Sequence, residues 1–235
     1  MNPASDRDEL TRGLFWPVVS VLGLGALILL AALGLYASQT GLSSAAAHFL
    51  ALDSTHIWWY FTRAAGIMGY MLLWLSVVLG FAVSTKILDP FLDRPFTYDF
   101  HEHLSLLSLG FIVFHALVLM FDPYEPLSLL QILVPFTSSY RPFWVGLGVI
   151  GLYLTVLVTV TFYLRNWISM RVFRSIHYLS VVAYLGSLLH GWFAGSDTSL
   201  PFMQSLYVGT SLASIFLLTY WLVGLWQGRR RAVQR

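Results

Sequence analysis

The sequence lacks cysteine entirely and is poor in charge, since charged residues make up only 10% of its 235 residues. Without cysteine, disulfides, iron–sulfur clusters and covalent C-x-x-C-H haem attachment are excluded, so any cofactor needs other ligands. Soluble domains carry about 25% charged residues, whereas this chain is 57% hydrophobic, with a mean hydropathy of +0.73. The composition indicates an integral membrane protein.

Apolar runs of transmembrane length recur along the chain, bounded by charge, proline or glycine. A bilayer core of about 30 Å requires about 20 apolar residues per helix, and such continuous runs differ from the short alternating strands of a barrel. We therefore expect an all-α membrane protein, a six-helix transmembrane bundle. The predicted helices run from Leu14 to Ala37, Phe61 to Ser84, Phe100 to Phe121, Phe143 to Leu164, Val172 to Phe193 and Phe202 to Trp226.

Positive charge is divided very unevenly between the connections. Lys and Arg accumulate on the cytoplasmic side of membrane proteins. When both termini are placed in the cytoplasm, only Arg63 and Arg141 of the thirteen basic residues lie on the outer side. The predicted organisation is a cytoplasmic segment over residues 1–13, the bundle over 14–227 and a basic cytoplasmic tail over 228–235. We expect a multi-pass protein of the inner or plasma membrane.

Two of the predicted helices carry histidine pairs at matching depths. His101 and His115 are fourteen residues apart in the third helix, and His177 and His190 are thirteen apart in the fifth, which runs parallel to it. At about 1.5 Å per residue, these steps are roughly 21 and 20 Å. Bis-imidazole ligation of a b-type haem needs two neutral histidines that face each other. We predict two haems b, an inner one between His101 and His177 and an outer one between His115 and His190.

Helical rotation supports this arrangement for only one of the two helices. Fourteen steps of about 100° return to within about 40° of the starting face, but thirteen steps leave an offset of about 140°. Either a distortion at Gly186 or approach of the two haems from different sides would accommodate His177 and His190. The sequence does not choose between them.

A structural role is the alternative for each histidine, because a single histidine in an apolar helix commonly bonds a neighbouring backbone or hydroxyl group. Four ionisable groups at paired depths favour function, since intramembrane polar residues are usually functional. His103 is the alternative inner ligand, but it stands about 120° from His115 and is expected at the headgroup boundary. His48 and His56 are expected to be solvated or interfacial.

Haem propionates are anionic and need cationic partners. The candidates are Arg63, at the outer start of the second predicted helix, and Arg174, three residues before His177. Positive-inside bias alone also accounts for Arg174, whereas Arg63 lies on the side that is poor in positive charge.

The outer connection "DPYEPLSLLQILVPFTSSYRPF" contains an apolar run that is too short to span the membrane. We expect it to lie along the surface and to cover the outer haem. The acidic residues Asp122, Glu125 and Asp197 on this side are expected to be solvated, with binding of a cationic acceptor as the alternative.

Around the histidines, the sequence resembles the ferric-reductase-like transmembrane domain, which occurs in NADPH oxidases, ferric reductases and the haem-bearing membrane subunit of a bacterial methionine sulfoxide reductase system. The resemblance covers the second to sixth predicted helices. It rests on the two histidine spacings, on "TRAAGIMGYMLLWLSVVLG", and on "RSIHYLS" with "HGWFAGSDTS". It implies haem ligation by His101, His115, His177 and His190, and electron flow outward from a cytoplasmic flavin.

The function that the sequence favours is transmembrane electron transfer by the haem-binding subunit of a redox system. We expect no flavin or nicotinamide site within this chain, so the donor would be a separate flavoprotein, a quinol or another membrane subunit of a larger complex. A non-redox or structural membrane subunit is the main alternative. A metal or proton carrier is disfavoured, because three of the helices offer almost no polar residues. Independent enzyme activity stays open, and no nucleic-acid partner is indicated.

Overall fold

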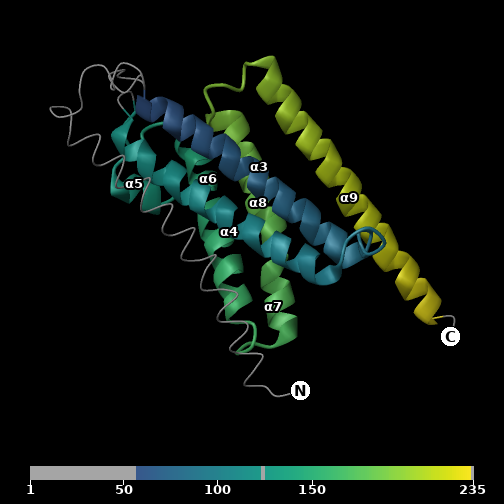
Figure 1. Ribbon diagram of the computed structural model, residues 1–235. Helices are drawn as coiled ribbons and strands as arrows, with labels where there is room; N and C mark the ends of the chain where they lie inside the picture. The colour runs from purple at the N-terminus through teal and green to yellow at the C-terminus, as the bar shows by residue number, and fades with distance from the viewer. Residues whose placement is uncertain (1–56, 123–124, 234–235) are drawn as a thin grey trace.

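A computed structural model describes residues 57–122 and 125–233, with side chains as far as Trp226 except Leu225 (Figure 1). The described residues are helical, without strands. The elements are α3 (Ile57–Thr85), α4 (Arg94–Val118), the 3₁₀ turn η1 (Leu119–Phe121), α5 (Leu129–Leu133), α6 (Pro142–Tyr163), α7 (Met170–His177), α8 (Leu179–Ala194) and α9 (Pro201–Val233). The first predicted helix, His48 and His56 lie outside the described residues.

Five helical segments of the described part are long and apolar enough to cross a membrane. They are Ile57–Thr85, Arg94–Phe121, Pro142–Tyr163, Met170–Ala194 and Pro201–Gly224. These segments coincide with the second to sixth predicted helices, which are therefore confirmed, and the chain is a multi-pass membrane protein in contact with lipid. The total of six helices and the cytoplasmic termini stay predictions.

Two helix pairs build the bundle. α3 packs along α4, and α6 packs along α8, while α3 also contacts α8 and so joins the two pairs. α9 lies against α3 on the outside of this assembly (Figure 1). A cluster of buried side chains joins α3, α8 and α9, and its members are Tyr70, Leu73, Val77, Tyr184, Met203 and Tyr207.

Local sequence signals set where several helices begin. α4 and α6 each start with a proline in the first turn, where a missing backbone N–H costs no helical hydrogen bond. Ser169 caps α7 by accepting a hydrogen bond from the backbone of Val172. The short apolar run of the outer connection forms α5, which opens with a reciprocal capping box between Ser128 and Gln131.

The fifth predicted helix is divided into two. α7 ends at His177 and α8 begins at Leu179, and the backbone N–H of Val181 bonds the carbonyl of Tyr178 at 3.2 Å, a three-residue closure of the 3₁₀ type. Gly186 lies inside α8, where a Cβ would meet the carbonyl of Leu147 at 3.5 Å, so it serves close packing on α6 rather than a break. This break lies between His177 and His190, so the regular rotation of about 100° per residue is interrupted between them.

Candidate haem-binding sites

The structure brings four histidines together in two pairs. The ring centres of His101 and His177 are 6.0 Å apart with planes at 71°, and those of His115 and His190 are 6.2 Å apart at 76°. We call the first pair the inner level and the second the outer level, after the predicted orientation. α4 supplies one ring to each level, and the α7–α8 segment supplies the other.

The separation of the rings fits a single metal ion between them. Bonds from imidazole nitrogen to a metal are about 2.0–2.1 Å long, and the ring centre lies about 1.2 Å beyond the nitrogen, so two opposed ligands have centres about 6.4–6.6 Å apart. Both levels come within about half an ångström of this range. Edge-to-face packing of two rings gives a similar separation. The hydrogen bonds of the rings therefore have to distinguish a metal-binding pair from simple ring packing.

At the outer level, both rings direct one nitrogen to a helix carbonyl. The Nδ1 of His115 is 2.7 Å from the carbonyl oxygen of Thr62 on α3, and the Nδ1 of His190 is 2.9 Å from that of Trp144 on α6. A carbonyl can only accept, so each Nδ1 carries the proton, and a neutral ring then keeps a lone pair on Nε2. This is the tautomer and the second contact that metal-binding histidines typically have.

The inner level is held less tightly. Ser105 donates its hydroxyl to the carbonyl of His101 at 2.8 Å, so in its 2.6 Å contact with Ser76 it must accept. The Ser76 oxygen therefore accepts from the Nδ1 of His101, at the longer distance of 3.4 Å. The Nδ1 of His177 is buried and has no hydrogen-bond partner among the described residues.

A cavity of about 410 Å³ contains the outer level. Its volume lies within the range of about 300–1,000 Å³ that is usual for ligand and cofactor sites. His115 and His190 line its walls, and so does Thr62, whose buried hydroxyl has no hydrogen-bond partner among the described residues. Gln131 and Ile132 of α5 also line it. The outer connection therefore covers this cavity, as its apolar run suggested.

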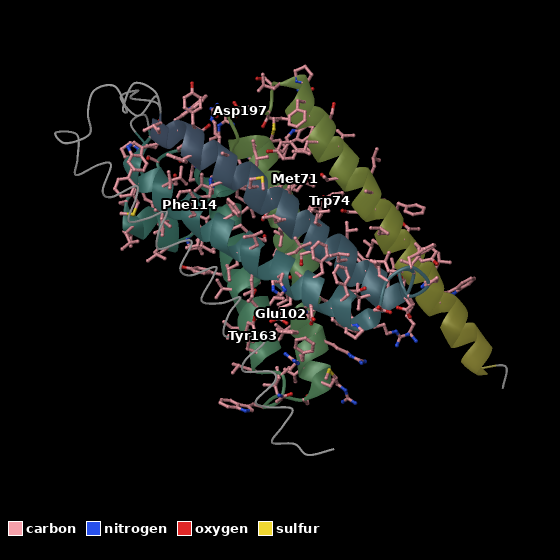
Figure 2. All side chains as sticks on the ribbon, in the orientation of Figure 1. Met71, Trp74, Glu102, Phe114, Tyr163 and Asp197 are labelled. Atoms are coloured by element: carbon pink, nitrogen blue, oxygen red, sulfur yellow. The ribbon has the colours of Figure 1, made fainter. Side chains whose placement is uncertain are left out.

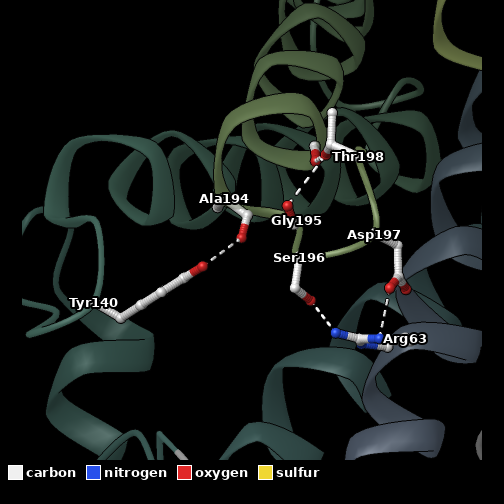
Figure 3. Close-up of polar contacts among 8 residues, drawn as sticks. Arg63, Tyr140, Ala194, Gly195, Ser196, Asp197 and Thr198 are labelled. Atoms are coloured by element: carbon white, nitrogen blue, oxygen red, sulfur yellow. Dashed lines mark hydrogen bonds and ion pairs between the residues drawn. The ribbon is translucent and has the colours of Figure 1, made fainter. Parts of the chain in front are cut away.

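Arg63 lies at the rim of the same cavity and is already partnered. It forms an ion pair of 2.6 Å with Asp197 and a hydrogen bond with Ser196 (Figure 3). It also makes a cation–π contact with the ring of Trp59 at 3.0 Å. The sequence did not indicate the partnership with Asp197, because 134 residues separate the two. The expectation that this carboxylate is simply solvated is wrong.

The end of α8 that carries His190 is tied down by side chains from elsewhere. Tyr140 donates to the carbonyl of Ala194 at 3.1 Å, and the Thr198 hydroxyl is 3.1 Å from the carbonyl of Gly195 (Figure 3). The same hydroxyl is 2.9 Å from the carbonyl of Trp192. Helix carbonyls at a C-terminus lack intrahelical partners. These contacts therefore fix the turn in which His190 lies.

Two other sequence candidates lie outside the histidine pairs. Arg174 is exposed on α7, one turn before His177, so it shares the same side of that helix. His103 is also exposed, and its Nδ1 is 2.7 Å from the carbonyl of Asp99 in its own helix. The structure thus brings His101, rather than His103, to His177.

Several polar and glycine positions next to the sites were not predicted from the sequence. The hydroxyl of Tyr163 donates to Glu102, beside His101, at 3.0 Å (Figure 2). Gly146, Gly148 and Gly151 have the spacing of a G-x-G-x-x-G nucleotide loop, but they lie within α6, where side chains of other segments pack against them. In α6 the pattern serves helix packing, because a nucleotide loop joins a strand to a helix.

The family described as "Ferric reductase like transmembrane component" matches residues 65–188, just over half of the chain. The chain belongs to this ferric-reductase-like family. The resemblance drawn from the histidine spacings is thereby confirmed, and the matched stretch contains His101, His115 and His177. Searches among curated proteins and among solved structures found no match.

Proposed function

We propose that this ferric-reductase-like protein transfers electrons across the membrane through two b-type haems, one at each level. The observation that carries the proposal is the pair of facing imidazoles at two depths, fourteen residues apart along α4. At about 1.5 Å per residue, the levels are roughly 21 Å apart along that helix. Two redox centres at this spacing provide a path between the two sides of a bilayer core of about 30 Å.

The number of ligands favours haem over a bare metal ion. No group of three or more His, Asp or Glu side chains that could hold a metal occurs among the described residues. Two imidazoles alone leave the remaining coordination positions to a ligand that the described residues do not supply. Haem supplies that ligand and, when bound by two histidines, one-electron redox chemistry.

The side chains of the protein have three tasks in this proposal. His101, His177, His115 and His190 present Nε2 lone pairs. The surrounding helices exclude water. Arg63 and Arg174 neutralise propionates, the first at the outer level and the second at the inner level. A guanidinium has five N–H donors, so the contacts of Arg63 with Asp197 and Ser196 leave donors for an anion in the cavity.

We further propose that electrons arrive at the inner level from a separate donor and leave at the outer level. The donor is a flavoprotein, a quinol or another membrane subunit, and the protein acts as the membrane subunit of a larger redox system in the inner or plasma membrane. The positive-inside bias supports the orientation.

Spectroscopy of the purified full-length protein tests the proposal directly. The reduced-minus-oxidised absorption spectrum should show b-type haem, and pyridine haemochrome quantification should give two haems per chain. A folded, colourless protein from cells supplied with haem precursor would refute the proposal. One haem per chain would refute the two-level pathway.

A further inference from the structure

The glycine at position 66 lies where a side chain would block the contact between His115 and α3. In an α-helix, a side chain leans back over the turn that precedes it and so covers the carbonyl region four residues earlier. Gly66 follows Thr62 by four residues, and Thr62 is the residue whose carbonyl accepts from His115. A Cβ at Gly66 would lie 3.0 Å from the Nδ1 of His115 and 3.1 Å from its Cε1.

The same arrangement recurs on α6 at the other side of the outer level. Trp144 supplies the carbonyl that accepts from His190, and the residue four positions later is Gly148. A Cβ at Gly148 would lie 2.7 Å from the Nδ1 of His190 and 2.9 Å from its Cε1. We call such a pair, an acceptor at one position and a glycine four residues later, a carbonyl–glycine cradle.

The inner level has only a loose counterpart of this arrangement. On α3, Ser76 and Gly80 follow Thr62 and Gly66 by fourteen residues, the same step that separates His101 from His115. The Ser76 hydroxyl is here 3.4 Å from the Nδ1 of His101, the Ser76 backbone also contacts this ring, and a Cβ at Gly80 would lie 3.6 Å from its Cε1. Both distances indicate weaker restraint of the ring.

No cradle serves His177. The His177–His190 step is thirteen residues, and neither thirteen nor fourteen residues beyond Gly148 does α6 have a glycine, because these positions are Thr161 and Phe162. Phe162 contacts Phe173, whose ring centre lies 5.3 Å from that of His177. This agrees with the buried Nδ1 of His177, which has no hydrogen-bond partner among the described residues.

We propose that Gly66 and Gly148 are positioning residues: each lets a helix carbonyl accept the Nδ1 proton of an outer-level histidine and thereby aims Nε2 at the bound cofactor. The outer pair is held rigidly on both sides, His101 is held loosely, and His177 is oriented by packing alone. The cofactor part of this inference rests on the proposed function, whereas the tautomers and ring positions belong to the chain itself.

Alanine substitutions of the glycines test the cradle on haem-loaded, full-length protein. Gly148→Ala should abolish or shift the low-spin electron paramagnetic resonance signal of the outer haem, and Gly66→Ala should shift it to a lesser degree. Gly80→Ala should leave both signals close to wild type. Gly209→Ala on α9 is the matched control, because a Cβ there meets nothing within 4 Å. Wild-type signals in both Gly66→Ala and Gly148→Ala would overturn the cradle and leave the proposed function intact.

A second measurement separates the two proposals and leaves both glycines in place. The full-length wild-type protein, purified from a haem-deficient host with ¹⁵N-labelled histidine, should show His115 and His190 as Nδ1–H tautomers, assigned by comparison with His115→Gln and His190→Gln. Nε2–H tautomers at these positions would overturn the cradle. Nδ1–H tautomers in a protein that never takes up haem would retain the cradle and refute the proposed function.

Discussion

Arg63 on α3 and Asp197, in the connection between α8 and α9, form an ion pair of 2.6 Å at the rim of the outer cavity (Figure 3). Their side chains are only 19% and 25% exposed, so water screens the pair less than it would a surface pair. The contact joins the start of α3 to the segment that follows the His190 helix. It therefore closes the bundle at the end where the outer site lies.

Removal of the Asp197 charge should destabilise the protein measurably. Asp197→Asn leaves Arg63 without its ionic partner, and the loss of a hydrogen bond to a charged group costs about 1.5–3 kcal/mol. Thermal unfolding in detergent should show a lowered transition temperature. The control is Asp89→Asn, which breaks the exposed pair with Arg94 and should leave the transition unchanged. Equal effects of the two variants would argue against a special role for the Arg63 contact.

Substitution of one outer histidine should remove one haem and preserve the other. His115→Leu keeps an apolar side chain of similar bulk on α4, so we expect the fold to persist and pyridine haemochrome quantification to fall by half. His103→Leu removes an exposed imidazole that bonds within its own helix and should leave both haems. Loss of haem in His103→Leu alone would reverse the assignment of the inner ligand to His101.

Loss of the Ser76 hydroxyl should shift the midpoint potential of the inner haem without removing the haem. A hydrogen bond from Nδ1 makes an imidazole a stronger donor to the metal, which stabilises the oxidised state. Ser76→Ala should therefore raise the midpoint potential of the inner haem in a redox titration, and only slightly, because the contact is 3.4 Å long. Ser84→Ala, at an exposed position of the same helix, is the control. A lowered potential would contradict the direction of the bond deduced for His101.

The tyrosine cluster between α3, α8 and α9 should stabilise the bundle beside the outer cavity, which Tyr70 and Tyr207 also line. The hydroxyls of Tyr70 and Thr210 are 2.5 Å apart, and Thr210 also bonds carbonyls of its own helix. Tyr70→Phe keeps the packed ring and leaves Thr210 with its carbonyl partners, but it removes the 3.5 Å contact of the buried Tyr184 hydroxyl. We therefore expect a loss of about 1–3 kcal/mol without loss of haem, because the cavity keeps its aromatic wall. Tyr220→Phe, at an exposed position of α9, should have no effect. Loss of the outer haem in Tyr70→Phe would show that the hydroxyl takes part in the site.

The local pattern of the chain was sufficient to predict the five described spans. Hydrophobic length specifies a membrane helix because the bilayer requires each segment to satisfy its own backbone hydrogen bonds. The spacing of His101 and His115 was equally readable, since both lie on one continuous helix with a constant rise. Depth matching then indicated which histidines of two parallel helices stand at the same level, and the structure has those rings side by side.

Features that join distant segments were decided by the tertiary structure alone. The break at Tyr178 separates His177 from His190, although no proline or glycine marks it. The pairing of Arg63 with Asp197 and the bonds of His115 and His190 to carbonyls of α3 and α6 depend on how helices pack, and the sequence carries no periodic signal for such contacts. By itself the sequence determined which segments enter the lipid and at what depth their histidines lie, because both follow from length and rise along one helix. Only the packed bundle decided which nitrogen of each imidazole is held and which remains free, because that depends on which backbone oxygen a neighbouring helix leaves uncovered.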